Sequence, residues 1–322
     1  MLIVMKFGGT SVAGPEEVRR AALTVARAVR RGARVAAVLS AQGDTTDELL
    51  SAAERYNPSP SPRELDMLLS TGEQASAALM AMALEDLGLE AVSLTGGQAG
   101  LETDETFGDA RLRRVDPWRA ERELSAGKVV LIAGFQGVTP AGDITTLGRG
   151  GSDTTAVAVA AALGADECRI YTDVEGVYTA DPRLVPEARK LEAVDIDEML
   201  RLSALGGKVL HERSVALAKR FHVPLTVLSS AVTAPGTRVT PLPLPEGEGR
   251  LTALGLSGSM VSLVGTALRA LPFRVGQRAA EALAGEGIPL EAYLETDRVL
   301  SLRVDPGRSE DALRCLHREF LE

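Results

Sequence analysis

The sequence of 322 residues is poor in several residue types, and each shortage excludes a class of protein. Its two cysteines, Cys168 and Cys315, lie far apart, and neither they nor the three histidines form a metal-ligand spacing. We therefore expect buried, unreactive thiols in a reducing compartment. No apolar run approaches the ~20 residues of a membrane-spanning helix, and the short apolar start has no signal-peptide pattern. The sequence predicts a cytoplasmic protein without membrane contact.

Positive charge is also scarce. The 35 Lys+Arg residues stand against 44 Asp+Glu residues, giving a formal net charge of −9, and only five of the cations are lysines. Nucleic acids and anionic lipids attract proteins with clustered cations, so neither is an expected partner. Asn57 is the sole asparagine. A GC-rich gene and adaptation to heat both explain such a bias, and the sequence leaves both open.

From residue 1 to about 230, short apolar runs alternate with amphipathic stretches, and this alternation favours an α/β domain with a mostly parallel, open sheet sandwiched by helices. The first helix is expected at Pro15, since proline suits the first helical position. The apolar runs carry few charges, as strands covered on both faces do. These predicted strands are Leu2–Lys6, Arg34–Leu39, Ala91–Leu94, Val129–Ala133, Arg169–Tyr171 and Pro224–Leu228.

A segment rich in proline and glycine divides the chain. Residues 234–249 contain too many of both for a regular element to be expected there, which indicates an interdomain linker. The predicted domains are therefore 1–233 and 250–322. The second is expected to be a small ferredoxin-like α+β unit, with strands Leu251–Leu256, Met260–Val264, Leu290–Leu294 and Val299–Val304 and helices Val275–Ala284 and Ser309–Phe320.

The first motif with chemical content is Lys6-Phe7-Gly8-Gly9-Thr10-Ser11, between the first strand and the first helix. Glycines let backbone approach an anion closely, and a lysine adds a point charge for phosphate oxygens. A plain strand-to-helix turn is the alternative interpretation. The position at the carboxyl end of a strand favours a binding function.

The second motif runs from Thr145 to Thr155 and enters the apolar helix Ala156–Leu163. Arg149 offers a planar fork for a carboxylate, and Ser152 and Asp153 lie where the helix begins. Anion recognition is the functional interpretation. The structural alternative makes Ser152 or Asp153 a helix cap, although that alternative does not explain the Arg-Gly-Gly sequence before it.

Weaker signals lie elsewhere. The stretch Tyr171–Arg183 follows another predicted strand, but its glycine and Asp-Pro would make turns in any protein. Residues 70–76 interrupt a helical pattern. Glu73 within them could pair with a substrate ammonium, and an exposed acid near a helix start is the alternative.

Taken together, Lys6–Ser11, Thr46 with Asp47, Glu73, Thr145–Asp153, Tyr171–Arg183 and Lys208–His211 resemble, in order, the motifs of the aspartate kinases in the amino acid kinase superfamily. The resemblance covers about residues 3–230. A weaker resemblance to a ligand-binding ACT module covers roughly 251–322, where there is room for one such module. The resemblance implies phosphorylation of L-aspartate by ATP with Mg²⁺, giving 4-phospho-L-aspartate, the first intermediate toward lysine, threonine and methionine.

The resemblance also implies residue roles. Lys6 and Asp153 would be catalytic, with Asp153 organising the reacting groups and magnesium, and no direct protein ligand to the metal is assigned. Aspartate would be held by Thr46, Glu73 at its ammonium, Arg149 at its α-carboxylate, and Ser152. The nucleotide would be held by Lys6, Phe7, Gly8, Gly9, Thr172, Asp173, Tyr178, Asp181, Arg183 and Lys208.

Two further expectations concern partners and alternatives. Aspartate kinases that are feedback-regulated usually carry two ACT modules, so a single module predicts weak or absent inhibition by lysine and threonine. Pairing of single modules across a homodimer would restore a shared sheet. The alternatives to an aspartate kinase are a kinase for another acidic amino acid and a non-catalytic amino-acid sensor.

Overall fold

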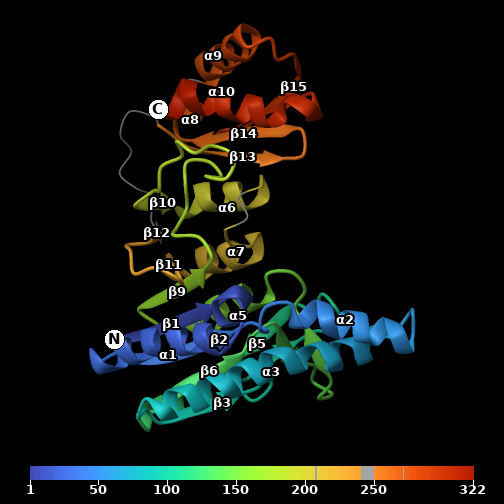
Figure 1. Ribbon diagram of the computed structural model, residues 1–322, viewed down its shortest axis with the longest axis vertical. Helices are drawn as coiled ribbons and strands as arrows, with labels where there is room; N and C mark the ends of the chain where they lie inside the picture. The colour runs from blue at the N-terminus through green and yellow to red at the C-terminus, as the bar shows by residue number, and fades with distance from the viewer. Residues whose placement is uncertain (207–208, 241–249, 271) are drawn as a thin grey trace. The chain divides into compact units, whose positions relative to one another are not determined.

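The computed structural model describes residues 1–206, 209–240, 250–270 and 272–322, and they form two compact units (Figure 1). The N-terminal unit comprises Met1–Glu175 and Ala216–Pro235, and the C-terminal unit comprises Gly176–Val215 and Gly236–Glu322. This division differs from the predicted domains 1–233 and 250–322, which stay a prediction. Among the described residues, no helix combines the length and apolarity needed to cross a bilayer.

The N-terminal unit is built on parallel strands in the spatial order β11-β9-β1-β2-β6-β3. Each is rich in valine, isoleucine or leucine, and the central ones are buried along almost their whole length, as expected for strands covered on both faces. The predicted strands are confirmed to within two residues. Their observed bounds are β1 Leu2–Phe7, β2 Arg34–Leu39, β3 Ala91–Leu94, β6 Val129–Ala133, β9 Glu167–Thr172 and β11 Leu225–Ser229.

Alternate residues of β1 enter two different layers. Ile3, Met5 and Phe7 are buried in a core shared with α1 (Pro15–Arg30) and α3 (Pro62–Asp86). Lys6 points to the opposite face, where it meets α5 (Gly151–Leu163). A strand with period two can supply a core residue and a functional residue in adjacent positions. α5 is apolar almost throughout, which fits a buried helix.

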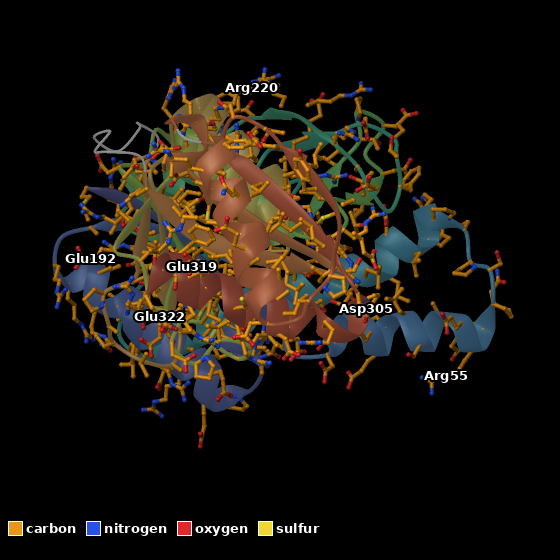
Figure 2. All side chains as sticks on the ribbon, turned by 90° about the horizontal axis from the view of Figure 1, so that it is seen from above. Arg55, Glu192, Arg220, Asp305, Glu319 and Glu322 are labelled. Atoms are coloured by element: carbon orange, nitrogen blue, oxygen red, sulfur yellow. The ribbon has the colours of Figure 1, made fainter. Side chains whose placement is uncertain are left out.

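Shorter elements connect these layers. β1 leads into η1 (Gly9–Val12), and β2 leads into α2 (Thr45–Tyr56). No residue of α2 is fully buried, and its Arg55 extends into solvent (Figure 2). Helix α4 (Trp118–Ser125) precedes β6. A small mixed sheet in the order β5-β4-β7-β8 then leads toward α5, with β4 at Leu101–Thr103, β5 at Leu112–Val115, β7 at Gln136–Val138 and β8 at Ile144–Thr146.

The C-terminal unit contains an antiparallel sheet in the order β13-β14-β16-β15, with helices packed on it. The predicted small α+β unit is thereby confirmed. Its elements are β13 Leu251–Ser257, β14 Met260–Gly265, α8 Ala267–Ala270, α9 Pro272–Gly285, β15 Leu290–Glu295, β16 Val299–Val304, η2 Pro306–Arg308 and α10 Ser309–Leu321. The C-terminal unit also contains β10 Ala193–Asp195, α6 Ile196–Ala204 and β12 Thr237–Thr240, while the sequence boundary between the units falls within α7 Glu212–Phe221.

The hydrophobic core of the C-terminal unit includes residues far from its sheet in sequence. Ala180 and Val185 are buried in the same cluster as Leu263 of β14 and Leu316 of α10. On the backbone, Leu254 N–H donates to the Thr179 carbonyl at 2.7 Å. The segment around residue 180 is therefore part of the C-terminal core.

Two sequence predictions of local structure are wrong. Residues 70–76 do not interrupt a helix, because α3 continues from Pro62 to Asp86. A Cβ on Gly72 would lie 2.9 Å from the Ala41 Cβ, so the glycine admits close packing rather than a break. The proposed linker also contains β12, Thr237–Thr240, paired in parallel with β10. These four residues contain neither proline nor glycine and include three β-branched ones, which suits a strand. Residues 241–249 lie outside the described part.

Candidate functional site

The candidate site lies at the carboxyl edge of the parallel sheet, where several strands end together. Backbone hydrogen bonds tie these ends to one another: Ser40 N–H donates to Phe7 O at 3.1 Å, and Gly134 N–H donates to Leu39 O at 2.9 Å. Ligands of open α/β sheets bind at this edge because loops and helix N-termini gather there. The predicted residues Lys6, Ser152 and Thr172 all occur at or beside it.

At the centre of this edge, Lys6 Nζ lies 2.7 Å from Asp153 Oδ1. Each side chain is only 12% exposed. Asp153 occupies the first turn of α5, after Gly150, which caps the helix in a left-handed conformation with φ 69°. The Lys6 ammonium and the N-terminus of α5 both present positive charge to the Asp153 side chain. The structure therefore brings together the two residues predicted to be catalytic.

The glycine loop beside Lys6 has a more specific geometry than the sequence indicated. Gly8 N–H donates to Tyr171 O at 3.2 Å, so this amide is already engaged. A Cβ on Gly9 would lie 2.9 Å from the Ala41 carbonyl oxygen, so this position needs glycine for close backbone approach. Phe7 stacks on Tyr171 with ring centroids 4.8 Å apart. Phe7 is thus part of the core beneath the loop.

Glu73 lies in the middle of α3 and is 3% exposed, so the exposed-acid interpretation is wrong. Its Oε1 accepts a hydrogen bond from Ala41 N–H at 3.1 Å, while Oε2 has no hydrogen-bond partner among the described residues. Burial raises the pKa of the Glu73 carboxyl to about 7, and the Ala41 hydrogen bond opposes the shift. A buried carboxylate oxygen without a partner is suited to a cationic ligand group.

The remaining residues assigned to aspartate binding differ in exposure. Ser152 is buried in the first turn of α5, and a Cβ on Gly134 would lie 2.8 Å from its Oγ. Thr46 is partly exposed in the first turn of α2. Arg149 is exposed and makes no ion pair with any residue that the structure describes. Its guanidinium is free to meet a ligand carboxylate.

Of the residues assigned to the nucleotide, Thr172 and Asp173 lie at the end of β9 in the N-terminal unit. Thr172 Oγ1 donates to Asp173 Oδ1 at 2.9 Å, and the Thr172 carbonyl accepts from Ser230 N–H at 2.9 Å. Asp173 is exposed.

The other nucleotide assignments belong to the C-terminal unit. Arg183 forms an ion pair with Asp181 at 2.6 Å, and its backbone N–H donates to the same carboxylate at 3.0 Å. Tyr178 is partly exposed and bridges to Lys190 through the backbone. Lys208 lies outside the described residues.

Sequence reasoning missed Asp66, which shapes the edge of the site. This residue of α3 is 1% exposed, and its carboxylate accepts from Thr146 Oγ1 at 2.6 Å and from Thr146 N–H at 2.8 Å. It also accepts from Gly108 N–H at 2.9 Å. Asp66, Ser70 and Glu73 are spaced four and three residues apart, which places them on one helical stripe. That polar stripe on a buried helix face was the available signal.

Neither cysteine takes part in the site. Both Cys168 and Cys315 are buried and free, so the prediction of buried thiols is confirmed, and burial raises the pKa of each thiol. Within the described ranges, no three His, Cys, Asp or Glu side chains are grouped so that they could hold a metal ion.

Comparison with known proteins identifies the family. The sequence profile described as the amino acid kinase family matches residues 1–229. The chain belongs to the amino acid kinase family. It is 49% identical to the aspartokinase of Thermus thermophilus over 91% of this chain and 72% of that protein. It is 56% identical to the aspartokinase of Geobacillus stearothermophilus over 74% of this chain and 58% of that protein. The resemblance to aspartate kinases is thus confirmed.

A solved structure of this kinase family extends the likeness to the whole fold. Aspartokinase III of E. coli, crystallised with aspartate and ADP, matches with a TM-score of 0.89 over 100% of both chains, at 23% identity. This match covers both compact units and confirms the predicted fold class. The chain spans 58% to 72% of the length of the two aspartokinases compared above.

Proposed function

We propose that the chain is an aspartate kinase, which uses ATP to convert the β-carboxylate of L-aspartate into 4-phospho-L-aspartate, the first intermediate toward lysine, threonine and methionine. The high identity to aspartokinases supports this assignment. The observation that carries it is the Lys6–Asp153 pair at the carboxyl edge of the sheet, on the same edge as Ala41, to which the buried Glu73 is hydrogen-bonded.

The chemistry needs no general base. A β-carboxylate is ionised at pH 7, since its ordinary pKa is about 4, and it can attack the γ-phosphorus directly. Phosphoryl transfer then forms a bond between a carboxylate oxygen and phosphorus while the bond to the ADP oxygen breaks. Two anions must be held in line and their repulsion offset. Lys6 supplies a nearly buried cation for that purpose.

Two charged side chains of the protein would recognise the two charged groups on the α-carbon of aspartate. Glu73 would accept the ammonium at its free Oε2, and Arg149 would receive the α-carboxylate. Thr46 and Ser152 would provide hydroxyl groups at the rim. This arrangement leaves the β-carboxylate directed toward the Lys6–Asp153 pair.

Nucleotide recognition would start at Lys6, Phe7, Gly8 and Gly9. Because the Gly8 amide is already engaged, we expect the Lys6 ammonium to make the main phosphate contact. We assign Thr172, Asp173, Tyr178, Asp181, Arg183 and Lys208 to the rest of the nucleotide.

The residues present fit a magnesium ion that arrives with ATP. Mg²⁺ in kinases takes phosphate oxygens and water with one or two carboxylates, and a single carboxylate, Asp153, stands at the centre of the edge. When bound, the ion would neutralise charge developing on the phosphates. Asp153 would keep Lys6 oriented and present its second oxygen to the reacting groups.

A direct test uses purified protein with Mg-ATP and L-aspartate, followed by hydroxylamine to trap any acyl phosphate. Hydroxamate from aspartate, with little from glutamate or N-acetylglutamate, is expected. Hydroxamate mainly from another acid would favour the second candidate, a kinase for that amino acid. ATP binding without hydroxamate from any acid would favour a non-catalytic sensor.

We also infer a homodimer formed through the C-terminal sheet. β15 is an edge strand, and its Tyr293 and Leu294 are 68% and 65% exposed. Exposed apolar edge strands pair readily with another strand. Light scattering should give a mass twice that of one chain, and Leu294→Lys should reduce the measured mass to that of a single chain. An unchanged dimer in that variant would place the interface elsewhere.

Two further expectations stay predictions from the sequence. They are weak or absent inhibition by lysine and threonine, and a cytoplasmic location.

A further inference from the structure

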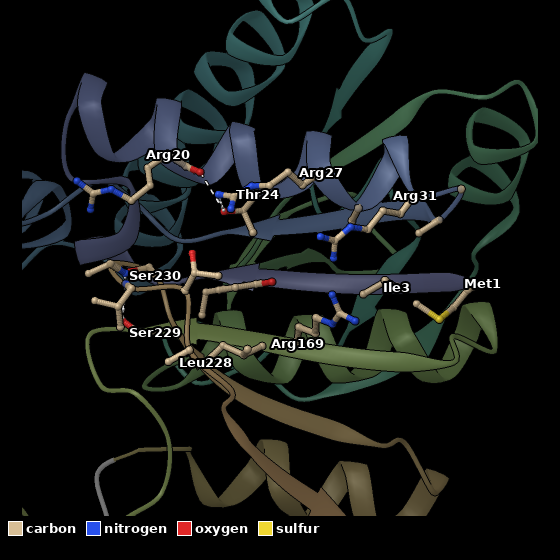
Figure 3. A pocket seen from close by; sticks show the side chains of 18 residues that line it. Met1, Ile3, Arg20, Thr24, Arg27, Arg31, Arg169, Leu228, Ser229 and Ser230 are labelled. Carbon is tan, nitrogen blue, oxygen red and sulfur yellow. Dashed lines mark hydrogen bonds between the residues drawn. The ribbon is translucent and has the colours of Figure 1, made fainter. Parts of the chain in front are cut away.

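A cavity of the N-terminal unit lies on the face of the sheet opposite Asp153. Its volume is about 580 Å³, and it is lined by α1, the strands β1 and β9, and the segment that follows β11 (Figure 3). Arg169 and Tyr171 of β9 line it, whereas Ile170 between them faces the other side of the sheet. This cavity is therefore separate from the Lys6–Asp153 pair.

The charged residues that line the cavity are all positive. Four arginines contribute to it, and no aspartate or glutamate does, in a chain that has nine more acids than cations. Arg20, Thr24 and Arg27 lie on one stripe of α1, and Arg31, which caps the C-terminus of that helix, continues the spacing of three or four residues. Figure 3 shows Arg31, at the C-terminal cap of α1, and Arg169 from β9 extending toward each other across the cavity.

Two of the four arginines, Arg27 and Arg31, have no carboxylate partner among the described residues. Arg27 donates only to neutral groups, the Leu23 carbonyl at 3.2 Å and Thr24 Oγ1 at 3.4 Å. Arg31 makes no ion pair with any described residue, and Arg20 approaches Glu17 only at 3.8 Å. Arg169 alone has a close carboxylate, Glu167, at 2.8 Å. Burial raises the pKa of the Tyr171 phenol, and Arg169 and Arg27 oppose that shift.

We propose that this cavity binds a small, multiply charged anion, a metabolite with phosphate or clustered carboxylate groups. Guanidinium forks match the oxygens of both groups, and two or more arginines converging on one space favour a doubly charged ligand. A bound anion would also relieve the repulsion among like charges on one helical stripe.

The binding test uses the full chain at fixed ionic strength with inorganic phosphate and with citrate, measured by calorimetry. Saturable binding of one anion per chain is expected, and Lys6→Ala should retain it. The double variant R27Q/R31Q should weaken binding at least about tenfold. The matched control R19Q/R34Q removes the same charge from exposed positions outside the cavity, and it should stay within about twofold.

The outcomes are decisive. Equal weakening in both double variants would mean general charge screening and would overturn the proposal, as would the absence of saturable binding. Loss in Lys6→Ala with no change in R27Q/R31Q would place the anion in the catalytic site and overturn it too. Tighter binding of phosphate or of citrate would identify which oxyanion the cavity prefers. Circular dichroism of each variant checks that it folds.

A functional consequence rests on the proposed kinase activity. Tyr171 lines the cavity, and its carbonyl accepts from Gly8 N–H at 3.2 Å and from Ser11 Oγ at 3.4 Å. An anion bound beside Tyr171 would therefore influence the position of the glycine loop, although it binds on the opposite face of the sheet. The anion should change the KM for ATP at least about twofold in the wild type and not in R27Q/R31Q. An equal change in both would remove this coupling, while the binding result would stand independently.

Discussion

The two compact units use buried polar groups in different ways. In the N-terminal unit, the Glu73 carboxylate keeps one oxygen without a hydrogen-bond partner in the described part of the chain. In the C-terminal unit, Ser262 Oγ and Ser301 Oγ lie 2.7 Å apart on adjacent strands, and Thr252 Oγ1 donates to the Glu198 carboxylate at 2.9 Å. An unsatisfied buried group costs stability and is retained where a ligand completes it, whereas a satisfied pair fixes architecture. The C-terminal unit also keeps one buried side-chain nitrogen without a hydrogen-bond partner among the described residues, His317 Nδ1. The contrast between Glu73 and His317 is therefore the kind of group left without such a partner, a carboxylate oxygen in the N-terminal unit and an imidazole nitrogen in the C-terminal unit.

The strongest test of this contrast is Lys6→Ala. Removing one electrostatic donor should lower kcat/KM by at least ~100-fold, and it should also lower stability, because the nearly buried Asp153 loses its ion-pair partner. Steady-state kinetics and thermal unfolding measure the two effects. Lys128→Ala, which removes an ion pair with Glu123, is the control and should be almost fully active. Near-normal turnover in Lys6→Ala would remove Lys6 from the site.

Glu73→Gln should change the KM for aspartate much more than the KM for ATP. Loss of a charge-assisted contact to the ammonium is worth about 1.5–3 kcal/mol, so the KM for aspartate should rise roughly 10- to 100-fold. The KM for ATP should change little. Glu64→Gln on the same helix is the control, because Glu64 is exposed. A uniform rise in both KM values would argue that Glu73 has only a structural role.

The pH dependence of aspartate binding gives a finer test. The pKa of Glu73 is about 7 in the free chain, so the carboxylate needed for an ammonium is mostly absent at pH 6 and mostly present at pH 8. The KM for aspartate should therefore fall about tenfold over that interval, and it should not do so in Glu73→Gln. A flat profile in the wild type would contradict this role.

Folding stability should change with pH in the opposite sense. Because the folded-state pKa of Glu73 lies above its ordinary 4.5, the folded chain holds this proton more tightly than the unfolded chain. This contribution is fully present below pH 4.5 and is lost as pH rises through about 7. Denaturant unfolding at pH 5 and 8 should show a loss of up to about 3 kcal/mol in the wild type that is missing in Glu73→Gln.

A smaller effect is expected for a satisfied pair in the C-terminal unit. Thr179 Oγ1 lies 2.9 Å from Nε2 of His317, which is fully buried. Burial lowers the pKa of His317, so the neutral ring is favoured. Thr179→Val should destabilise the chain by about 1–3 kcal/mol in denaturant titrations. A double-mutant cycle with His317→Leu should show coupling, and strict additivity would contradict it.

The smallest expected effect on stability concerns Arg183 and Asp181. Their ion pair is solvent-exposed, so Arg183→Gln should change the free energy of unfolding by less than about 1 kcal/mol. If Arg183 contacts the nucleotide, the KM for ATP should nevertheless rise several-fold while the KM for aspartate stays constant. Arg308→Gln, which breaks a comparable exposed pair with Asp311, is the control. Equal kinetics in both variants would withdraw Arg183 from the nucleotide assignment.

The sequence predicted the strands well, because buried parallel strands are recognisable as short apolar runs. It assigned catalytic roles to Lys6 and Asp153 only through family resemblance, and it did not predict their ion pair, because residues 147 positions apart carry no local signal of contact. Its errors come from long-range packing. From the sequence, Gly72 favours a break in the helix, but in the fold it allows α3 to pack closely against Ala41. From the sequence, Thr237–Thr240 is predicted to be part of a linker, but in the fold it pairs with β10 as a strand.

The arginine-lined cavity escaped notice for a similar reason. Positions 20, 27 and 31 look like the solvated face of a helix, which is the ordinary fate of such residues. Only the fold places Arg169 of β9 opposite them. Likewise, nothing local to Ala180 and Val185 indicates that they complete a core with residues more than 70 positions later.

The alternation along β1 has a consequence for engineering this protein. Three of its side chains fill a core while Lys6 reaches the opposite layer, so strand register and chemistry are specified together. Deleting or inserting one residue between Leu2 and Met5 would turn Lys6 toward α1 and a hydrophobic side chain toward Asp153. Libraries with length variation should therefore spare this strand and place their changes in exposed connections such as the one after α2.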